Sequence, residues 1–182
     1  MKPSKIKILK AKKTWFLLPN FKGITWMGVV YCRKDAYINE INNADGINSN
    51  FESHEMIHVR QAQAMNDSWF RFYLDYVVSY LKNISLITVN IQAPYRLIPT
   101  EIEAYLNQDN WNYASEVKGV YGWKEFKKLT LGEKREIARK YYKSNEKKSF
   151  TAVLHEFFEN KCKKGVDNYG EGYKCIDTER NK

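Results

Sequence analysis

The stretch FESHEMIHVRQAQAM, residues 51–65, constrains this chain more than any other, because it holds two of the three histidines four residues apart. On an α-helix, residues four apart lie on one face with their Cβ atoms about 6 Å apart. Two imidazoles at that spacing can bind one zinc ion at about 2.0–2.1 Å. We therefore expect a helix here, ending near Met65, with His54 and His58 as metal ligands.

Glu55 follows His54 directly and so lies about 100° further round the same helix. That position makes it a poor ligand but lets it take a proton from a water at the open coordination site. This is the mechanical reason why the H-E-x-x-H spacing recurs in zinc hydrolases. We expect Glu55 to be the general base. Gln61, two turns after His54, could line the cleft or be an ordinary polar helix residue.

A catalytic zinc site that keeps a water needs a third protein ligand. His155 is the one other histidine and lies far along the chain, whereas IPTEIEAY, residues 98–105, places Glu101 and Glu103 at the start of an expected helix. Thr100 and Glu103 fit a capping box, which would occupy Glu103 and leaves Glu101 without another duty. We expect Glu101 to be the third ligand, with Glu103 as the alternative.

The residues before the histidine helix predict β-structure. Residues 24–33 and 36–41 mix β-branched and aromatic residues between turn residues, which is typical of strands. Ser49, with Glu52 three residues on, offers a capping box that would start the helix.

The residues after the histidine helix predict further helices. Asn66-Asp67-Ser68 should end the first helix, and residues 69–82 repeat apolar side chains at helical spacing, which favours a second helix packed on the first. Thr100 should cap a third helix that reaches about Tyr113 or further. Two or three short amphipathic helices should follow Gly122.

The motifs together resemble the gluzincin group of zincin metallopeptidases, especially small bacterial members. HEMIH continues as H-E-x-x-H-x-x-Q with Gln61, and EIEAY supplies a downstream E-x-E-A helix; the resemblance covers about residues 24–115. It implies a sheet of three or four strands ahead of the active-site helix, one edge of which would bind an extended peptide. It also implies that Tyr105 stands where some gluzincins have an Asp that orients a ligand histidine.

The expected fold class is α+β, with a small antiparallel or mixed sheet before the H-E-x-x-H helix and a second ligand helix, and a basic helical extension at the C-terminus. The corresponding divisions are a basic segment over 1–22, a zincin-like core over 23–117 and the extension over 118–182. The extension carries 17 Lys and Arg against 10 Asp and Glu, within a formal net charge of +9. No nucleic-acid-binding signature accompanies that charge, which makes a nucleic-acid partner unlikely and favours a solvated surface or a protein partner.

Cysteine count and hydropathy limit the compartment. Three scattered cysteines do not make a disulfide framework, and a reducing compartment is the simplest interpretation. The most apolar stretch, residues 69–91, contains Arg71, Asp75 and Lys82, so it falls short of a transmembrane segment. We expect a soluble cytoplasmic protein; peripheral membrane or virion association stays open.

The function that this pattern predicts is a zinc-dependent peptidase acting on a peptide or protein, with Zn²⁺ as cofactor. Tyr95, Arg96, Tyr105 or His155 could supply the oxyanion contact, and the sequence does not choose among them. The alternative is a catalytically weak or inactive protein that keeps a zincin fold as a structural component of a larger assembly, for example a phage particle.

Overall fold

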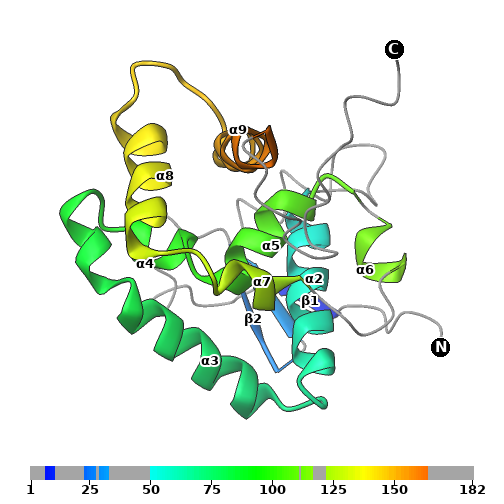
Figure 1. Cartoon of the computed structure of the whole chain (residues 1–182). Coiled ribbons are helices and arrows are strands. Elements are labelled where there is room, and N and C mark those ends of the chain that lie inside the picture. The colour runs from blue at the N-terminus through cyan, green and yellow to red at the C-terminus, as the bar shows by residue number, and fades with distance from the viewer. Residues whose placement is uncertain are drawn as a thin grey trace. The chain divides into compact units, whose positions relative to one another are not determined.

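The protein is mostly helical over the residues that its computed structural model describes, which are 7–10, 23–27, 29–32, 50–110, 112–116 and 122–163 (Figure 1). The expected α+β fold class is wrong for this chain. The strands contribute three segments of four residues each, beside helices of up to 15 residues. Strands of that length pair over few residues, so the packing of helices, and not a sheet, forms the core.

The three short strands are β1 (Lys7–Lys10), β2 (Gly23–Trp26) and β3 (Val29–Cys32), paired in the order β1-β3-β2. β1 runs parallel to β3, and β2 runs antiparallel to it. Met27, with a left-handed φ of 50°, turns the chain between β2 and β3. The single strand expected over 24–33 is therefore two strands, and the one expected over 36–41 lies outside the described residues.

Helix α2 (Asn50–Ala64) matches the helix expected from the two histidines. It packs against β2 and against the short helix α6 (Tyr113–Glu116), and these elements belong to the first of two compact units of the chain. Asn66 and Asp67 follow with left-handed φ values of 63° and 54°, which end the helix where the sequence predicted a break. The expected cap residue Ser49 lies outside the described residues.

The second unit is helical and contains most of the remaining elements. In chain order they are α3 (Trp69–Lys82), the 3-10 helix η1 (Ile84–Thr88), α4 (Ala93–Arg96), α5 (Pro99–Asn107), α7 (Trp123–Phe126), α8 (Leu131–Lys143) and α9 (Phe150–Lys163). Their apolar side chains form one core cluster: Leu86, Ala93, Leu97, Ile102, Leu106, Phe126, Leu129, Ile137, Ala138, Phe150, Val153, Leu154, Phe157 and Phe158.

The buried side chain of Asn83 forms hydrogen bonds with three other residues of this unit. The Asn83 amide nitrogen donates to the backbone carbonyls of Pro94 and Leu97, at 3.1 and 2.8 Å, and the Asn83 oxygen accepts from Lys134 Nζ at 2.9 Å. Asn83 is 1% exposed, so each of these bonds replaces water that the folded chain excludes. Burial and the nearby charge of Lys82 lower the pKa of Lys134 to about 8.

Helix α5 begins earlier and ends sooner than expected. Its first residue is Pro99, which suits a helix N-terminus because proline has no N–H to satisfy, and its last is Asn107 instead of about Tyr113. Thr100 therefore lies inside the first turn and is not the cap. The capping box occurs elsewhere, at the start of α8, where Thr130 and Glu133 bond each other's backbone N–H.

Helix α3 has the expected limits but not the expected packing. Of its residues only Phe72 and Ser79 are buried, while Val77 and Leu81 of the expected core-facing stripe are more than half exposed. None of the helices in the described ranges is long and apolar enough to cross a bilayer.

The sequence favoured a reducing compartment without a disulfide framework. Cys162, in the last turn of α9, is disulfide-bonded. Disulfides are rare in reducing compartments, so this bond does not support that expectation.

Candidate metal centre

The two histidines of α2 face each other across one helical turn. Their Nε2 atoms lie 3.2 Å apart and their rings meet nearly edge to face, with an interplanar angle of 85°. Two nitrogens bound to one tetrahedral zinc at 2.0–2.1 Å lie roughly 3.3 Å apart. The separation in the helix therefore already fits two ligands of one ion. Both side chains are buried, at 7% and 6% exposed, which shields such a site from bulk water.

Gln61 fixes the orientation of His58. Its amide oxygen lies 2.8 Å from His58 Nδ1, and Gln61 is completely buried. Because an amide oxygen only accepts, Nδ1 is the protonated nitrogen and Nε2 presents its lone pair toward His54. A ligand histidine usually has its other nitrogen held in this way. Gln61 thus takes the positioning role that the sequence left open.

Glu101 lies in the first turn of α5 and is 1% exposed. The Tyr76 hydroxyl of α3 donates a hydrogen bond to its Oε1 at 2.9 Å. Burial, and then the negative charge of Glu101, raise the pKa of the Tyr76 phenol well above its ordinary value. Tyr76 therefore stays protonated at neutral pH and remains a donor to the carboxylate.

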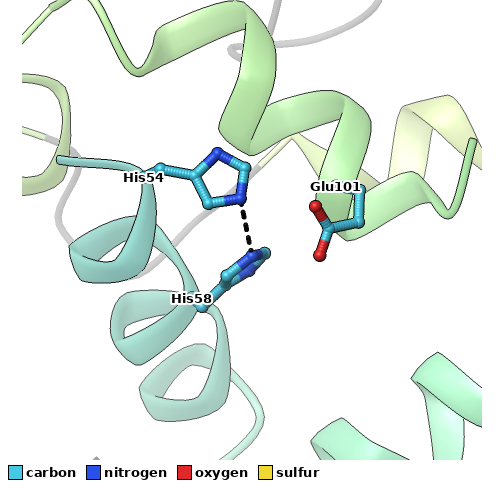
Figure 2. Close-up of side chains that lie close together, drawn as sticks. All are labelled: His54, His58 and Glu101. Atoms are coloured by element: carbon cyan, nitrogen blue, oxygen red, sulfur yellow. Dashed lines mark hydrogen bonds between the residues drawn. The ribbon is translucent and has the colours of Figure 1, made fainter. Parts of the chain in front are cut away.

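His54, His58 and Glu101 form a group whose potential ligand atoms all lie within 4.8 Å of one another (Figure 2). The donor set is two imidazole nitrogens and one carboxylate oxygen, which matches three-ligand zinc sites that keep a fourth position for water. Figure 2 shows both rings and the carboxylate directed toward a common space. The side chains present could therefore hold a metal ion.

Glu55, the expected base, is 6% exposed and accepts a hydrogen bond at Oε2 from the Thr25 hydroxyl of β2. Thr25 therefore fixes the position of the Glu55 carboxylate. The sequence did not single out Thr25, because this residue comes close to Glu55 only through the packing of β2 against α2.

Three other sequence candidates do not join the metal group in the described part of the chain. Glu103 accepts a hydrogen bond from the backbone N–H of Gly122 at 2.5 Å instead of closing a capping box on Thr100. His155 lies on α9, half-buried, and is not part of the group. Tyr105 packs edge to face against Phe150, with ring centroids 5.0 Å apart.

The remaining oxyanion candidates differ in their surroundings. Arg96 places its guanidinium 5.4 Å from the ring centroids of Tyr105, Tyr141 and Phe150, so it packs among aromatic rings in the second unit. The Tyr95 ring lies 6.1 Å from the ring of Tyr76 and so belongs to the surroundings of Glu101. Of these candidates, Tyr95 is the one that the second unit places beside a residue of the metal group.

Tyr76, like Thr25, is a residue near the site that the sequence did not reveal as such. It was expected to be one of several apolar core side chains of its helix, whereas its hydroxyl binds Glu101. A tyrosine in an otherwise apolar stripe is a weak signal for a buried polar partner. In this structure Gln61 is hydrogen-bonded to His58 and Tyr76 to Glu101, whereas Tyr105 packs against Phe150.

Comparison with known proteins does not assign this protein to a family. No protein-family model matches the chain, and no curated protein or solved structure shows a significant match. The candidate metal site therefore rests on the geometry of its own side chains.

Proposed function

We propose that the protein is a zinc-dependent peptidase whose metal is held by His54, His58 and Glu101. The observation that carries the proposal is the buried group of two facing imidazoles and one carboxylate, with Glu55 next to the first histidine. A bound zinc ion supplies a Lewis acid that activates a water and polarises the scissile carbonyl.

The protein's own residues would perform the remaining work. Gln61 and Tyr76 hold two of the three ligands, one through His58 Nδ1 and the other through Glu101 Oε1. Glu55 takes a proton from the attacking water and delivers it to the leaving amine, as a general base and then a general acid. Thr25 holds the Glu55 carboxylate in place through a hydrogen bond from its hydroxyl.

An extended peptide is the substrate class that the first unit supports. Among the described strands β2 lies at the end of the order β1-β3-β2, and an extended peptide commonly adds to a sheet beside such an outer strand. β2 also carries Thr25, the partner of Glu55, which places the catalytic base beside that strand. Trp26 and Met27 at its end are about half exposed and offer apolar contact to substrate side chains.

The test compares wild type with Glu55→Gln, using Glu52→Gln on the same helix as the matched control. We expect wild type and Glu52→Gln to bind one zinc per chain and to cleave members of a peptide library. Glu55→Gln should bind zinc equally and cleave at least about a hundredfold more slowly, because general acid–base catalysis contributes 10²–10⁴-fold. Equal cleavage by wild type and Glu55→Gln would refute the assignment, and so would zinc binding that survives in His54→Ala and Glu101→Ala.

A non-catalytic protein that uses zinc to stabilise its fold within a larger assembly is the second candidate. The observation that favours it is burial: His54, Glu55, His58 and Glu101 are each at most 7% exposed. This candidate predicts that removing zinc lowers the melting temperature while no peptide is cleaved. The library assay above, run with zinc-loaded protein, separates it from the peptidase.

A further inference from the structure

The stretch from α3 through η1 exposes an unusual number of large apolar side chains. Phe70 is 75% exposed and Ile91 is 71% exposed, and six others between them are 40–59% exposed. We call this set the apolar face; its members are Phe70, Leu74, Val77, Val78, Leu81, Ile84, Ile87 and Ile91.

The spacing of these residues gives α3 one exposed apolar side. Phe70, Leu74, Val77, Val78 and Leu81 recur at intervals of three and four, which places them on one side of the helix. The five side chains on this side of α3 are each 40–75% exposed, and a helix side this apolar and this exposed marks an interaction site in many proteins. We therefore expect the apolar face to bind another apolar surface, which would bury it from water.

The charges around the apolar face are positive. Arg71 and Lys82 are its exposed charged neighbours on α3, and the one acid of this helix, Asp75, is in an ion pair with Lys127. Over the described residues of the second unit, 15 Lys and Arg stand against nine Asp and Glu. An apolar helix face bordered by cations is the pattern of helices that lie in the interface of an anionic bilayer.

We infer that α3 and η1 dock the protein on the surface of an anionic lipid bilayer, with α3 parallel to the membrane plane. The apolar face enters the boundary between headgroups and acyl chains, and Arg71 and Lys82 contact lipid phosphates. No described helix is long and apolar enough to cross the bilayer, so the docking is peripheral. A second copy is a poorer occupant, because a two-fold interface on this face brings its own Arg71 and Lys82 toward their copies.

The experiment is co-sedimentation of the full chain with vesicles of phosphatidylcholine alone or with added phosphatidylglycerol. We expect binding to the anionic vesicles, weaker binding to the neutral ones, and partial loss at high salt because the Debye length shortens. Leu74→Gln/Leu81→Gln should weaken partitioning at least about tenfold, because it removes apolar area that the bilayer would bury. A second variant, Phe70→Gln/Ile91→Gln, changes the two most exposed side chains and should act in the same direction.

Leu131→Gln is the matched control, since Leu131 is an exposed leucine of α8 outside the apolar face. It should bind vesicles as wild type does. Absence of binding to anionic vesicles, or an equal loss in Leu131→Gln, would overturn the inference. A dimer in size-exclusion chromatography that Leu74→Gln/Leu81→Gln converts to monomer, without vesicle binding, would assign the face to a second copy instead. Circular dichroism of each variant confirms that the fold is retained.

Discussion

Tyr76→Phe tests whether the hydrogen bond to Glu101 supports a metal ligand. The change removes one hydroxyl and keeps the ring, so it deletes the 2.9 Å bond to a carboxylate that is 1% exposed. A hydrogen bond to a charged group contributes about 1.5–3 kcal/mol. We therefore expect the metal-free variant to lose about 2 kcal/mol of unfolding free energy in urea, because the buried carboxylate loses a donor.

The effect on zinc should be of similar size. Removing a group that orients a metal ligand typically costs 10–100-fold in affinity, which corresponds to about 1.4–2.7 kcal/mol. A competition titration against a chromophoric chelator at neutral pH measures it. The control is Tyr80→Phe, one turn further along α3, since Tyr80 makes no hydrogen bond to Glu101 in the described structure.

The same hydrogen bond can be isolated with a double-mutant cycle. In a Glu101→Gln background, Tyr76→Phe should change zinc affinity far less than it does in wild type, because the charged acceptor is already gone. If Tyr76→Phe and Tyr80→Phe bind zinc equally well, or if the two changes at positions 76 and 101 are additive, Tyr76 does not act through Glu101 and the reasoning fails.

Three further changes test other parts of the structure. Thr25→Val should cost about 1–3 kcal/mol of unfolding free energy, because buried Glu55 loses a hydrogen-bond donor. Thr25→Ser keeps that donor and should restore the stability, as measured by urea unfolding. Neither change should alter zinc affinity in the chelator titration. Asn83→Ala should cost at least about 3 kcal/mol in urea unfolding, because it leaves two buried carbonyls and a lysine without their partner; a loss below about 1 kcal/mol would show that water replaces the amide. Lys134 has a folded pKa of about 8 and an unfolded pKa of about 10.4, so between these pH values the unfolded state binds more protons and stability rises with pH. The unfolding free energy of wild type minus that of Lys134→Met should rise by up to about 3 kcal/mol over that range, and a flat difference would contradict the lowered pKa.

The sequence predicted those features that depend on local spacing. The limits of α2 and α3 follow from helical periodicity and from the break at Asn66 and Asp67. The approach of His54 to His58 follows from one turn of helix, so no tertiary information was needed. The proximity of Glu101 to these histidines was expected by eliminating the other carboxylate, and the structure places it there.

The features that the sequence did not predict depend on contacts between distant segments. The bond from Tyr76 to Glu101 joins α3 to α5, and the bond from Thr25 to Glu55 joins β2 to α2. The fold class was wrong because β-branched and aromatic residues over 24–33 indicated strands without showing how short they are. The apolar stripe of α3 was expected to pack in the core, but Val77 and Leu81 are more than half exposed. Helical periodicity indicates that one side of a helix is apolar, but it does not indicate which part of the protein covers that side.

The two glutamates of α5 lie two residues apart and so leave the helix in nearly opposite directions. Glu101 belongs to the metal group, whereas Glu103 accepts one backbone N–H at the start of α7. Their tolerance of substitution should therefore differ among natural variants of this chain. Glutamine keeps the acceptor that Gly122 needs at position 103, but at position 101 it replaces an anionic ligand with a neutral amide. A variant with Glu at 101 and Gln at 103 would keep the carboxylate of the metal group. A variant with Gln at 101 and Glu at 103 would lose that carboxylate and should bind metal more weakly.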